Sequence, residues 1–222
     1  MNRAPISDEE LEKLIPHRRD ISYGPRYFKF ADGDHGPASE LFGDVLYSLF
    51  KPSSAIDFGC GTGGTLAALA AHGVEVQAVD GSEHCIPFVA RRNQQIANEL
   101  LVHDLSKPLE LKRQYDLAIS TECFEHLPPG GSEVLVSTVA AAAPRAVITA
   151  CGPTGKNPLH TNERPFEFWM ELFEKNGMKL NRGKTGELRV IMRQHKENLP
   201  AGVPLVPSWY FGGYIGIFEK EK

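Results

Sequence analysis

Short apolar runs alternate with segments of helical periodicity through most of the chain. Runs rich in Val, Ile, Leu and Ala are typical of buried strands, whereas helices carry apolar residues three and four positions apart. Parallel strands joined by crossover helices produce this alternation, because both faces of their sheet are covered. We therefore predict an α/β fold with strands at residues 55–58, 74–80, 100–104, 115–120 and 145–150 and a terminal strand at 209–218.

Helices are expected between these strands, where the apolar periodicity changes from two to nearly four. Ala and Leu favour helix strongly, and Pro or Gly mark several of the ends. The predicted helices cover residues 65–72, 83–96, 132–142, 165–175 and 186–195.

About fifty residues precede the first predicted strand. A helix is predicted from Ser7, a capping residue, to Pro16, and another from Pro37 to about Phe50. The aromatic stretch between them, residues 21–30, is interpreted as an ordered cover that is not a strand. We expect two parts in the chain, an N-terminal helical and aromatic lid at 1–50 and the α/β domain at 51–222.

Composition limits the classes of function. The chain has 222 residues, a formal net charge of −4 and a pI of about 6.1, which gives no overall attraction to nucleic acid. No apolar run is long enough to span a bilayer, and the first residues lack a hydrophobic signal core, so a cytoplasmic location without membrane contact is expected. The sequence gives no indication of an oligomeric state.

Cysteine usage agrees with the expected cytoplasmic location. The four cysteines form no Cys-x-x-Cys pair and have no metal-like spacing with histidine. We expect them to be reduced and buried, and we predict no metal site. They are Cys60, Cys85, Cys123 and Cys151.

The segment 55–64, AIDFGCGTGG, passes from an apolar strand into a glycine-rich turn that precedes a predicted helix. This arrangement leaves backbone amides where a ligand can approach them. Gly59, Gly61 and Gly64 match the G-x-G-x-x-G pattern of dinucleotide-binding folds. The turn alone leaves two cofactor classes open, a nicotinamide or flavin dinucleotide and S-adenosylmethionine (SAM).

Acidic residues at the strand ends separate these cofactors. Asp80 stands about twenty residues after the first glycine, where a carboxylate accepts hydrogen bonds from the ribose hydroxyls of either cofactor. Asp57 would repel a pyrophosphate but suits a ligand that carries an ammonium and a sulfonium. Asp104 and Leu105 follow the third strand, where an adenine amino group and ring can be contacted. The alternative for Asp80 and Asp104 is a plain capping role, but together the acids favour SAM.

These motifs, with Glu125-His126-Leu127-Pro128 after the fourth strand, resemble a class I SAM-dependent methyltransferase of the small-molecule type found in ubiquinone and natural-product biosynthesis. The resemblance covers about residues 53–151. It implies a Rossmann-like, seven-stranded, mostly parallel sheet with an antiparallel last strand and helices on both faces. The cofactor-binding residues that it implies are Asp57, Gly59, Cys60, Gly61, Gly63, Asp80, Gly81, Asp104, Leu105 and Glu122. Cys60 and Gly81 depart from the residues usual in such enzymes.

The expected reaction is methyl transfer to an oxygen or nitrogen of a small-molecule acceptor. A hydroxyl acceptor must lose its proton near the time of attack, and histidine is the usual base near neutral pH. His126 is the first candidate base, with a structural role in its turn as the alternative, and His160 is the second, with a place in a solvated loop as the alternative. Tyr23, Tyr27 and Asn162 are predicted to contact the acceptor, although Asn162 is equally suited to capping the next helix.

Several aromatic residues of the N-terminal stretch belong to this prediction. Tyr23, Tyr27, Phe28 and Phe30 are expected to close over the cofactor and acceptor, or to serve only as packing on the sheet.

Two other functions remain as alternatives. A methyltransferase acting on RNA or protein is disfavoured by the acidic balance and by Thr-Glu-Cys-Phe at 121–124, where an Asn-Pro-Pro-Tyr-like motif would be expected. A nicotinamide-dependent oxidoreductase is supported only by the glycine pattern.

Overall fold

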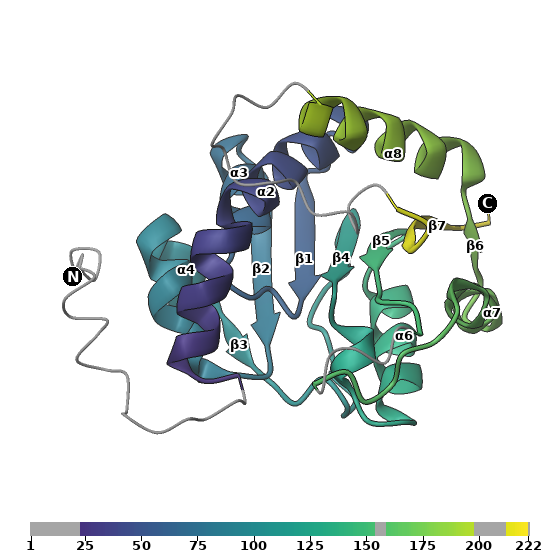
Figure 1. Cartoon of the computed structure of the whole chain (residues 1–222), viewed down its shortest axis with the longest axis horizontal. Coiled ribbons are helices and arrows are strands. Elements are labelled where there is room, and N and C mark those ends of the chain that lie inside the picture. The colour runs from purple at the N-terminus through teal and green to yellow at the C-terminus, as the bar shows by residue number, and fades with distance from the viewer. Residues whose placement is uncertain (1–22, 154–158, 198–211, 222) are drawn as a thin grey trace.

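The computed structural model describes residues 23–153, 159–197 and 212–221. A seven-stranded sheet in the order β3-β2-β1-β4-β5-β7-β6 forms its centre (Figure 1). The strands are β1 (Ser54–Phe58), β2 (Glu75–Asp80), β3 (Leu101–Val102), β4 (Leu117–Thr121), β5 (Arg145–Thr149), β6 (Met178–Leu180) and β7 (Ile215–Lys220). Only β7 runs antiparallel to its neighbours, as the resemblance implies.

The strand order reverses at β1. The chain moves outward through β2 and β3, then returns to place β4 on the other side of β1, with Ile56 in register with Gln77 on one side and Ala118 on the other. Because all of these strands are parallel, their carboxyl ends meet at one edge of the sheet. A crevice at the carboxyl ends beside such a reversal is the usual ligand site of this architecture.

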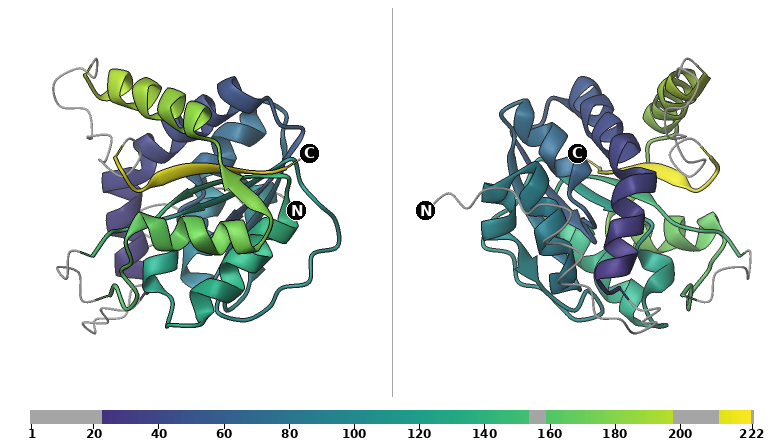
Figure 2. Two further views of the ribbon diagram at one scale, coloured as in Figure 1. Left: turned by 90° about the vertical axis from the view of Figure 1, so that its right-hand side faces the viewer. Right: turned by 60° about the vertical axis from the view of Figure 1, so that its left-hand side comes forward.

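Helices cover both faces of the sheet (Figure 2). Alternate residues along each strand point to opposite faces, so Ile215 and Ile217 of β7 join one apolar cluster and Phe218 joins the other. The first cluster also contains residues of α2 (Pro25–Phe50), α3 (Gly64–Ala71), α4 (Ile86–Arg92), α5 (Gln94–Glu99) and α8 (Arg182–Glu197). The second cluster contains residues of α6 (Gly131–Ala142) and α7 (Phe166–Lys175).

The N-terminal part differs from the prediction. One 26-residue helix, α2, begins at Pro25 and continues through Pro37, which was expected to start a separate helix. An internal proline costs about 3 kcal/mol because it lacks an N–H and crowds the preceding turn. Burial outweighs this cost, since the α2 side chains of Phe28, Phe42 and Leu46 are at most 1% exposed. The predicted helix at 7–16 lies outside the described residues.

Packing joins α2 to the α/β layer. The backbones of α2 and α3 approach so closely that a Cβ on Gly43 would lie 2.4 Å from the carbonyl oxygen of Thr65. α2 also shares one apolar cluster with α3, α4, α5 and α8. The division of the chain into two parts at residue 50 stays a prediction.

Other boundaries shift where local signals are weak. The helix predicted at 83–96 is three pieces, η1 (Glu83–Cys85), α4 and α5. Asn93 separates the last two because its backbone is extended and its side chain accepts hydrogen bonds from Gln95 N and Ile96 N. The strand at 178–180 was not predicted, and the last helix is longer than expected, at Arg182–Glu197. No helix within the described ranges has the length and low polarity needed to cross a membrane.

Candidate active site

A cavity of about 360 Å³ lies at the carboxyl ends of β1, β2 and β4, beneath the start of α2. Its size is within the usual range of small-ligand sites. Most of the predicted site residues line it: Tyr23, Tyr27, Asp57, Gly59, Cys60, Gly61, Asp80, Gly81, Asp104, Leu105, Glu122 and His126. Sequence reasoning did not assign Ala31, Ser39, Thr62, Thr65, Ser82, Thr121, Cys123 and Leu127, which also line it. Among these, Ser82 had a local signal, since it directly follows the Asp80-Gly81 pair.

The glycine turn forms the floor between β1 and α3. Gly59 has a φ of +79°, and a Cβ there would lie 2.7 Å from the sulfur of Cys123, so only glycine fits. Gly63 has a φ of +77° and precedes the first residue of α3. A Cβ on Gly63 would meet Val89 at 3.1 Å, and the residue does not line the cavity, so its contact with the cofactor stays a prediction.

Asp80 is held in place by backbone amides. One carboxylate oxygen accepts a hydrogen bond from Gly61 N at 2.9 Å and the other accepts one from Ser82 N at 2.9 Å. Burial raises its pKa to about 6, against the opposing effect of these hydrogen bonds. The group is therefore mainly ionised at pH 7 and has lone pairs left for a ligand in the cavity.

Asp57 is a buried carboxyl group with an unmatched atom. Its side chain lines the cavity, the residue is 2% exposed, and its Oδ1 has no hydrogen-bond partner. Burial, and secondarily the charge of Asp80, raise its pKa to about 8. An uncompensated buried carboxylate is costly, so this atom is suited to a cationic or hydrogen-donating group in the cavity.

Two further carboxyl groups lie on the β4 side. Glu122 has a φ of +49°, unusual for a residue with a Cβ, and its N–H donates to Thr149 O at 3.2 Å and Thr149 Oγ1 at 2.9 Å. Glu125 is completely buried and accepts a hydrogen bond from Cys151 N at 3.0 Å. Burial raises the pKa of both carboxyl groups, and their mutual contact favours one shared proton.

His126 presents one nitrogen as a proton acceptor. Its Nδ1 lies 3.2 Å from Leu159 O, and a carbonyl oxygen only accepts, so Nδ1 carries the proton and Nε2 has the free lone pair. Burial, and then His160, lower the pKa of His126 to about 4, so its imidazole is neutral at pH 7. Tyr23 packs edge-on against the ring at 5.4 Å between ring centroids.

His160 stands behind His126. Its ring centre is 4.5 Å from that of His126, and its Nδ1 lies 2.8 Å from Glu163 Oε1. His126 lines the cavity and His160 does not, so the two candidate bases differ in their access to a ligand there.

Asn162 does not face the cavity, in contrast to the prediction that it binds the acceptor. The residue is 4% exposed. Its Nδ2 donates to Ser132 Oγ at 2.6 Å and its Oδ1 accepts from Arg164 Nε at 2.8 Å. The alternative as a helix cap is also wrong, since α7 has no side-chain cap. Its hydrogen bonds tie the loop after β5 to α6.

The aromatic cover is partly as predicted. Tyr23, Tyr27 and Phe28 line the cavity, and Tyr23 and Tyr27 pack edge to face at 4.8 Å between centroids. Burial raises the pKa of Tyr27 to about 12, and the Oη of Tyr23 has no hydrogen-bond partner. Phe30 is 61% exposed and does not close over the cavity, because it lies on the outer side of α2.

All four cysteines are free, three are buried and Cys151 is half-buried. The predicted burial is confirmed for Cys60, Cys85 and Cys123 and is wrong for Cys151.

A second hollow of about 680 Å³ lies at the opposite edge of the sheet and includes Ser54, His72 and Asp116. Its polar groups already pair within the protein: Asp116 accepts from Ser53 N at 2.8 Å and Ser54 N at 3.0 Å, and His72 pairs with Asp44. It also lies at the amino ends of the strands, so the cavity beside Asp57 is the better candidate site.

Comparison with known proteins agrees with the architecture. A family model described as a methyltransferase domain matches residues 36–194. The sugar N-methyltransferase KedS8 from Streptoalloteichus has a TM-score of 0.62 at 13% identity, with 94% of this chain and 97% of that chain covered. A TehB-like SAM-dependent methyltransferase from Corynebacterium glutamicum has a TM-score of 0.60 at 18% identity, with 91% and 100% covered.

The mitomycin 7-O-methyltransferase MmcR has a TM-score of 0.56 at 14% identity. The match covers 90% of this chain but only 59% of that protein's length. A search of curated protein sequences found no match. The identities are low, so these structures establish the fold, and the predicted Rossmann-like sheet with its antiparallel last strand is confirmed.

Proposed function

Because the chain belongs to the methyltransferase-domain family, we propose that it transfers a methyl group from SAM to an oxygen or nitrogen of a small-molecule acceptor. The observation that carries this proposal is the buried, unmatched Oδ1 of Asp57 in the same cavity as Asp80. Two carboxyl groups at neighbouring strand ends favour a cationic ligand.

The residues around the cavity fit SAM. Asp57 would receive the ammonium group, Asp80 the ribose hydroxyls, and Asp104 with Leu105 the adenine. Backbone at Gly59, Cys60, Gly61 and Gly81 would approach the cofactor closely, and Glu122 would lie toward the sulfonium. When bound, SAM supplies a methyl group already activated by the positive sulfur.

Orientation is the main contribution expected of the protein itself. Methyl transfer is a displacement at carbon that requires aligned donor and acceptor and exclusion of water. Tyr23, Tyr27 and Phe28 would exclude water from above. His126 would accept a proton at Nε2, because its Nδ1–H is engaged by Leu159 O. With a pKa of about 4, His126 is neutral at pH 7 and can accept a proton. Its low basicity suits an acceptor group whose proton becomes acidic as the bond to the methyl group forms.

Asp57 also argues against a nicotinamide dinucleotide. A cationic ligand would favour the ionised form of Asp57 and pair with it, whereas a pyrophosphate in the turn would be repelled by the Asp80 carboxylate and would gain no charge pairing from the protonated Asp57. An RNA or protein acceptor has no particular support from the cavity, whose volume of about 360 Å³ leaves little room beyond a cofactor and a small acceptor.

Calorimetric titration with SAM, S-adenosylhomocysteine and NAD tests the proposal. We expect binding of the first two and none of NAD. The Asp80→Ala variant should lose about 1–3 kcal/mol of cofactor binding, the cost of leaving polar partners unmatched. Tight NAD binding without a response to SAM would overturn the proposal, and unchanged affinity in Asp80→Ala would remove the ribose assignment.

A further inference from the structure

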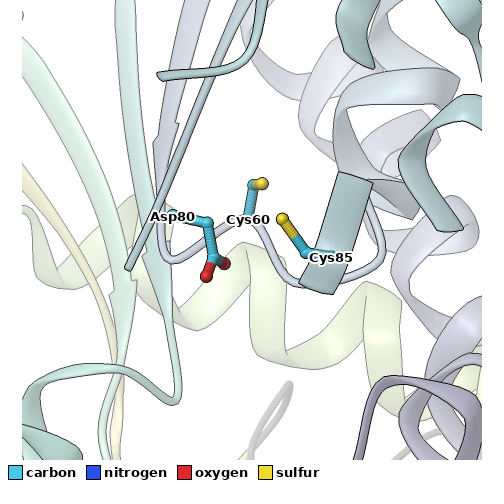
Figure 3. A group of neighbouring side chains, drawn as sticks. All are labelled: Cys60, Asp80 and Cys85. Carbon is cyan, nitrogen blue, oxygen red and sulfur yellow. The ribbon is translucent and has the colours of Figure 1, made fainter. Parts of the chain in front are cut away.

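Three side chains of typical zinc-binding chemistry converge in one wall of the cavity. The sulfur atoms of Cys60 and Cys85 and a carboxylate oxygen of Asp80 all lie within 4.8 Å of one another. Figure 3 shows the two sulfur atoms turned toward each other beside the carboxylate of Asp80. The three residues are buried, with Cys60 and Asp80 each 8% exposed and Cys85 0% exposed.

Short backbone segments hold these groups together. Cys60 N donates to Val79 O at 3.1 Å, which fixes the turn after β1 to the end of β2. Asp80 is fixed by the amides of Gly61 and Ser82. Cys85 ends η1, where Ser82 caps the turn by accepting from His84 N at 3.3 Å. The sequence gives no indication of this cluster, because β2 and the loops at its ends separate the two cysteines along the chain.

The two sulfur atoms and the carboxylate oxygen favour one class of metal ion. Two thiolates and a carboxylate suit Zn²⁺ or the softer Cd²⁺, with water or another ligand in the fourth position. Zinc–thiolate bonds of about 2.3 Å place two sulfurs about 3.8 Å apart in a tetrahedral site, so the cluster would contract by roughly 1 Å at most. Contact with Cys85, followed by burial, raises the pKa of the Cys60 thiol, and a bound cation would reverse that effect.

We propose that Cys60, Cys85 and Asp80 form a binding site for a soft divalent metal ion, Zn²⁺ or Cd²⁺, and that occupation of this site excludes the cofactor. The ion replaces the two thiol protons, which are released to solvent. It enters through the cavity, because Cys60 and Asp80 line the cavity and Cys85 lies directly behind them. The exclusion rests on the proposed function, which assigns Asp80 to the ribose, but metal binding does not.

Titration of the cofactor-free full-length protein with Cd²⁺ tests the site, with the ultraviolet charge-transfer absorption of cadmium thiolate as readout. We expect one ion bound through two thiolates. Cys60→Ser and Cys85→Ser should each weaken the affinity by at least about tenfold, since removal of even outer groups of metal sites costs that much. Circular dichroism checks that each variant is folded, and Cys85→Ala replaces Cys85→Ser where the hydroxyl disturbs packing.

Two controls make the titration specific. Cys123→Ser removes a buried thiol that lines the same cavity but lies outside the cluster, so Cd²⁺ binding should be retained. Cys151 lies near His160 and Glu163 in another group of potential ligands, so the series is repeated in a Cys151→Ser background. Binding that persists unchanged in folded Cys60→Ser and Cys85→Ser proteins would overturn the site.

Competition then tests the exclusion. S-adenosylhomocysteine should raise the apparent Kd of Cd²⁺ by a factor of one plus the ratio of its free concentration to its own Kd. Simultaneous binding of both ligands at full affinity would overturn the exclusion. If S-adenosylhomocysteine does not bind at all, the proposed function fails, and the titration without cofactor still decides the metal site.

Discussion

The two sides of the cavity are built differently. On the side of β1 and β2, Asp80 is fixed by the amides of Gly61 and Ser82, 19 and 2 residues away, within the successive elements β1, α3 and β2 and their turns. On the side of β4 and β5, Glu125 is fixed by Cys151 N and His126 by Leu159 O, partners 26 and 33 residues away in the sequence.

The two sides therefore differ in how their side chains are held in place. A side chain held by nearby backbone amides depends on a local motif that is visible in the sequence. A side chain held by a distant loop depends on how the strands are ordered, and its environment sets its protonation. Under the proposed function, the first side would hold the cofactor, and the second would contact the acceptor, which differs from one enzyme to another.

The largest effect is expected from His126 on the β4 side. His126→Ala should lower turnover by about a hundredfold or more if Nε2 accepts the proton, with unchanged affinity for S-adenosylhomocysteine. His160→Ala is the matched control and should cause a smaller loss, because His160 contacts the His126 ring and does not line the cavity. Turnover is measured as S-adenosylhomocysteine release, with an acceptor found by screening a metabolite library. Equal losses in both variants would contradict the separation of their roles.

On the side of β1 and β2, replacing Asp57 should have opposite effects on the stability of the protein and on its affinity for the cofactor. Its pKa of about 8 exceeds the unfolded value of 3.8, so the folded protein holds a proton that the unfolded chain releases, and stability falls as the pH rises between these values. At pH 9 Asp57→Asn should be more stable than the wild type by about 1–3 kcal/mol, since it removes a buried, unmatched charge.

Denaturant unfolding at pH 5 and pH 9 measures this effect. The advantage of Asp57→Asn should be much smaller at pH 5, where Asp57 is protonated in the folded protein, and this comparison serves as the internal control. The variant should bind S-adenosylhomocysteine more weakly at pH 7.5. A variant that is less stable at pH 9 would show that the Asp57 carboxylate is matched within the protein.

Asn162 tests the tie between the two distant segments of the β4 side. Asn162→Ala should lower the free energy of unfolding by about 1–3 kcal/mol, because it removes the donor to the buried Ser132 Oγ, which keeps only its own hydrogen bond to Phe124 O. Cofactor affinity should stay unchanged. Ser132→Ala should give a loss of similar size, and a change confined to acceptor binding would restore the predicted substrate contact.

Phe30 is expected to have the smallest effect. Phe30→Ala should change stability by less than about 0.5 kcal/mol and leave cofactor affinity unaltered, since the side chain is 61% exposed. Phe28→Ala is the positive control, because that ring lines the cavity and is 1% exposed. A marked loss of affinity in Phe30→Ala would place this ring over the cavity.

The sequence by itself determined the α/β alternation, the glycine turn and the acids at the strand ends. These follow from local rules: apolar periodicity selects strand or helix, glycine is required where φ is positive at Gly59, and a carboxylate at the end of a parallel strand faces the ligand edge. The amide partners of Asp80 lie in turns of the successive elements β1, α3 and β2, so its position followed as well.

Only the tertiary structure decided the rest. Burial against α3 carried α2 through Pro37, against the local preference of proline. The positions of Asn162 and His160 depended on a loop whose partners lie on other elements, so no local pattern could separate them from the cavity. The approach of Cys60 to Cys85 also required β2 to bring two loops together, because short-range spacing contains no information about contacts across a folded sheet.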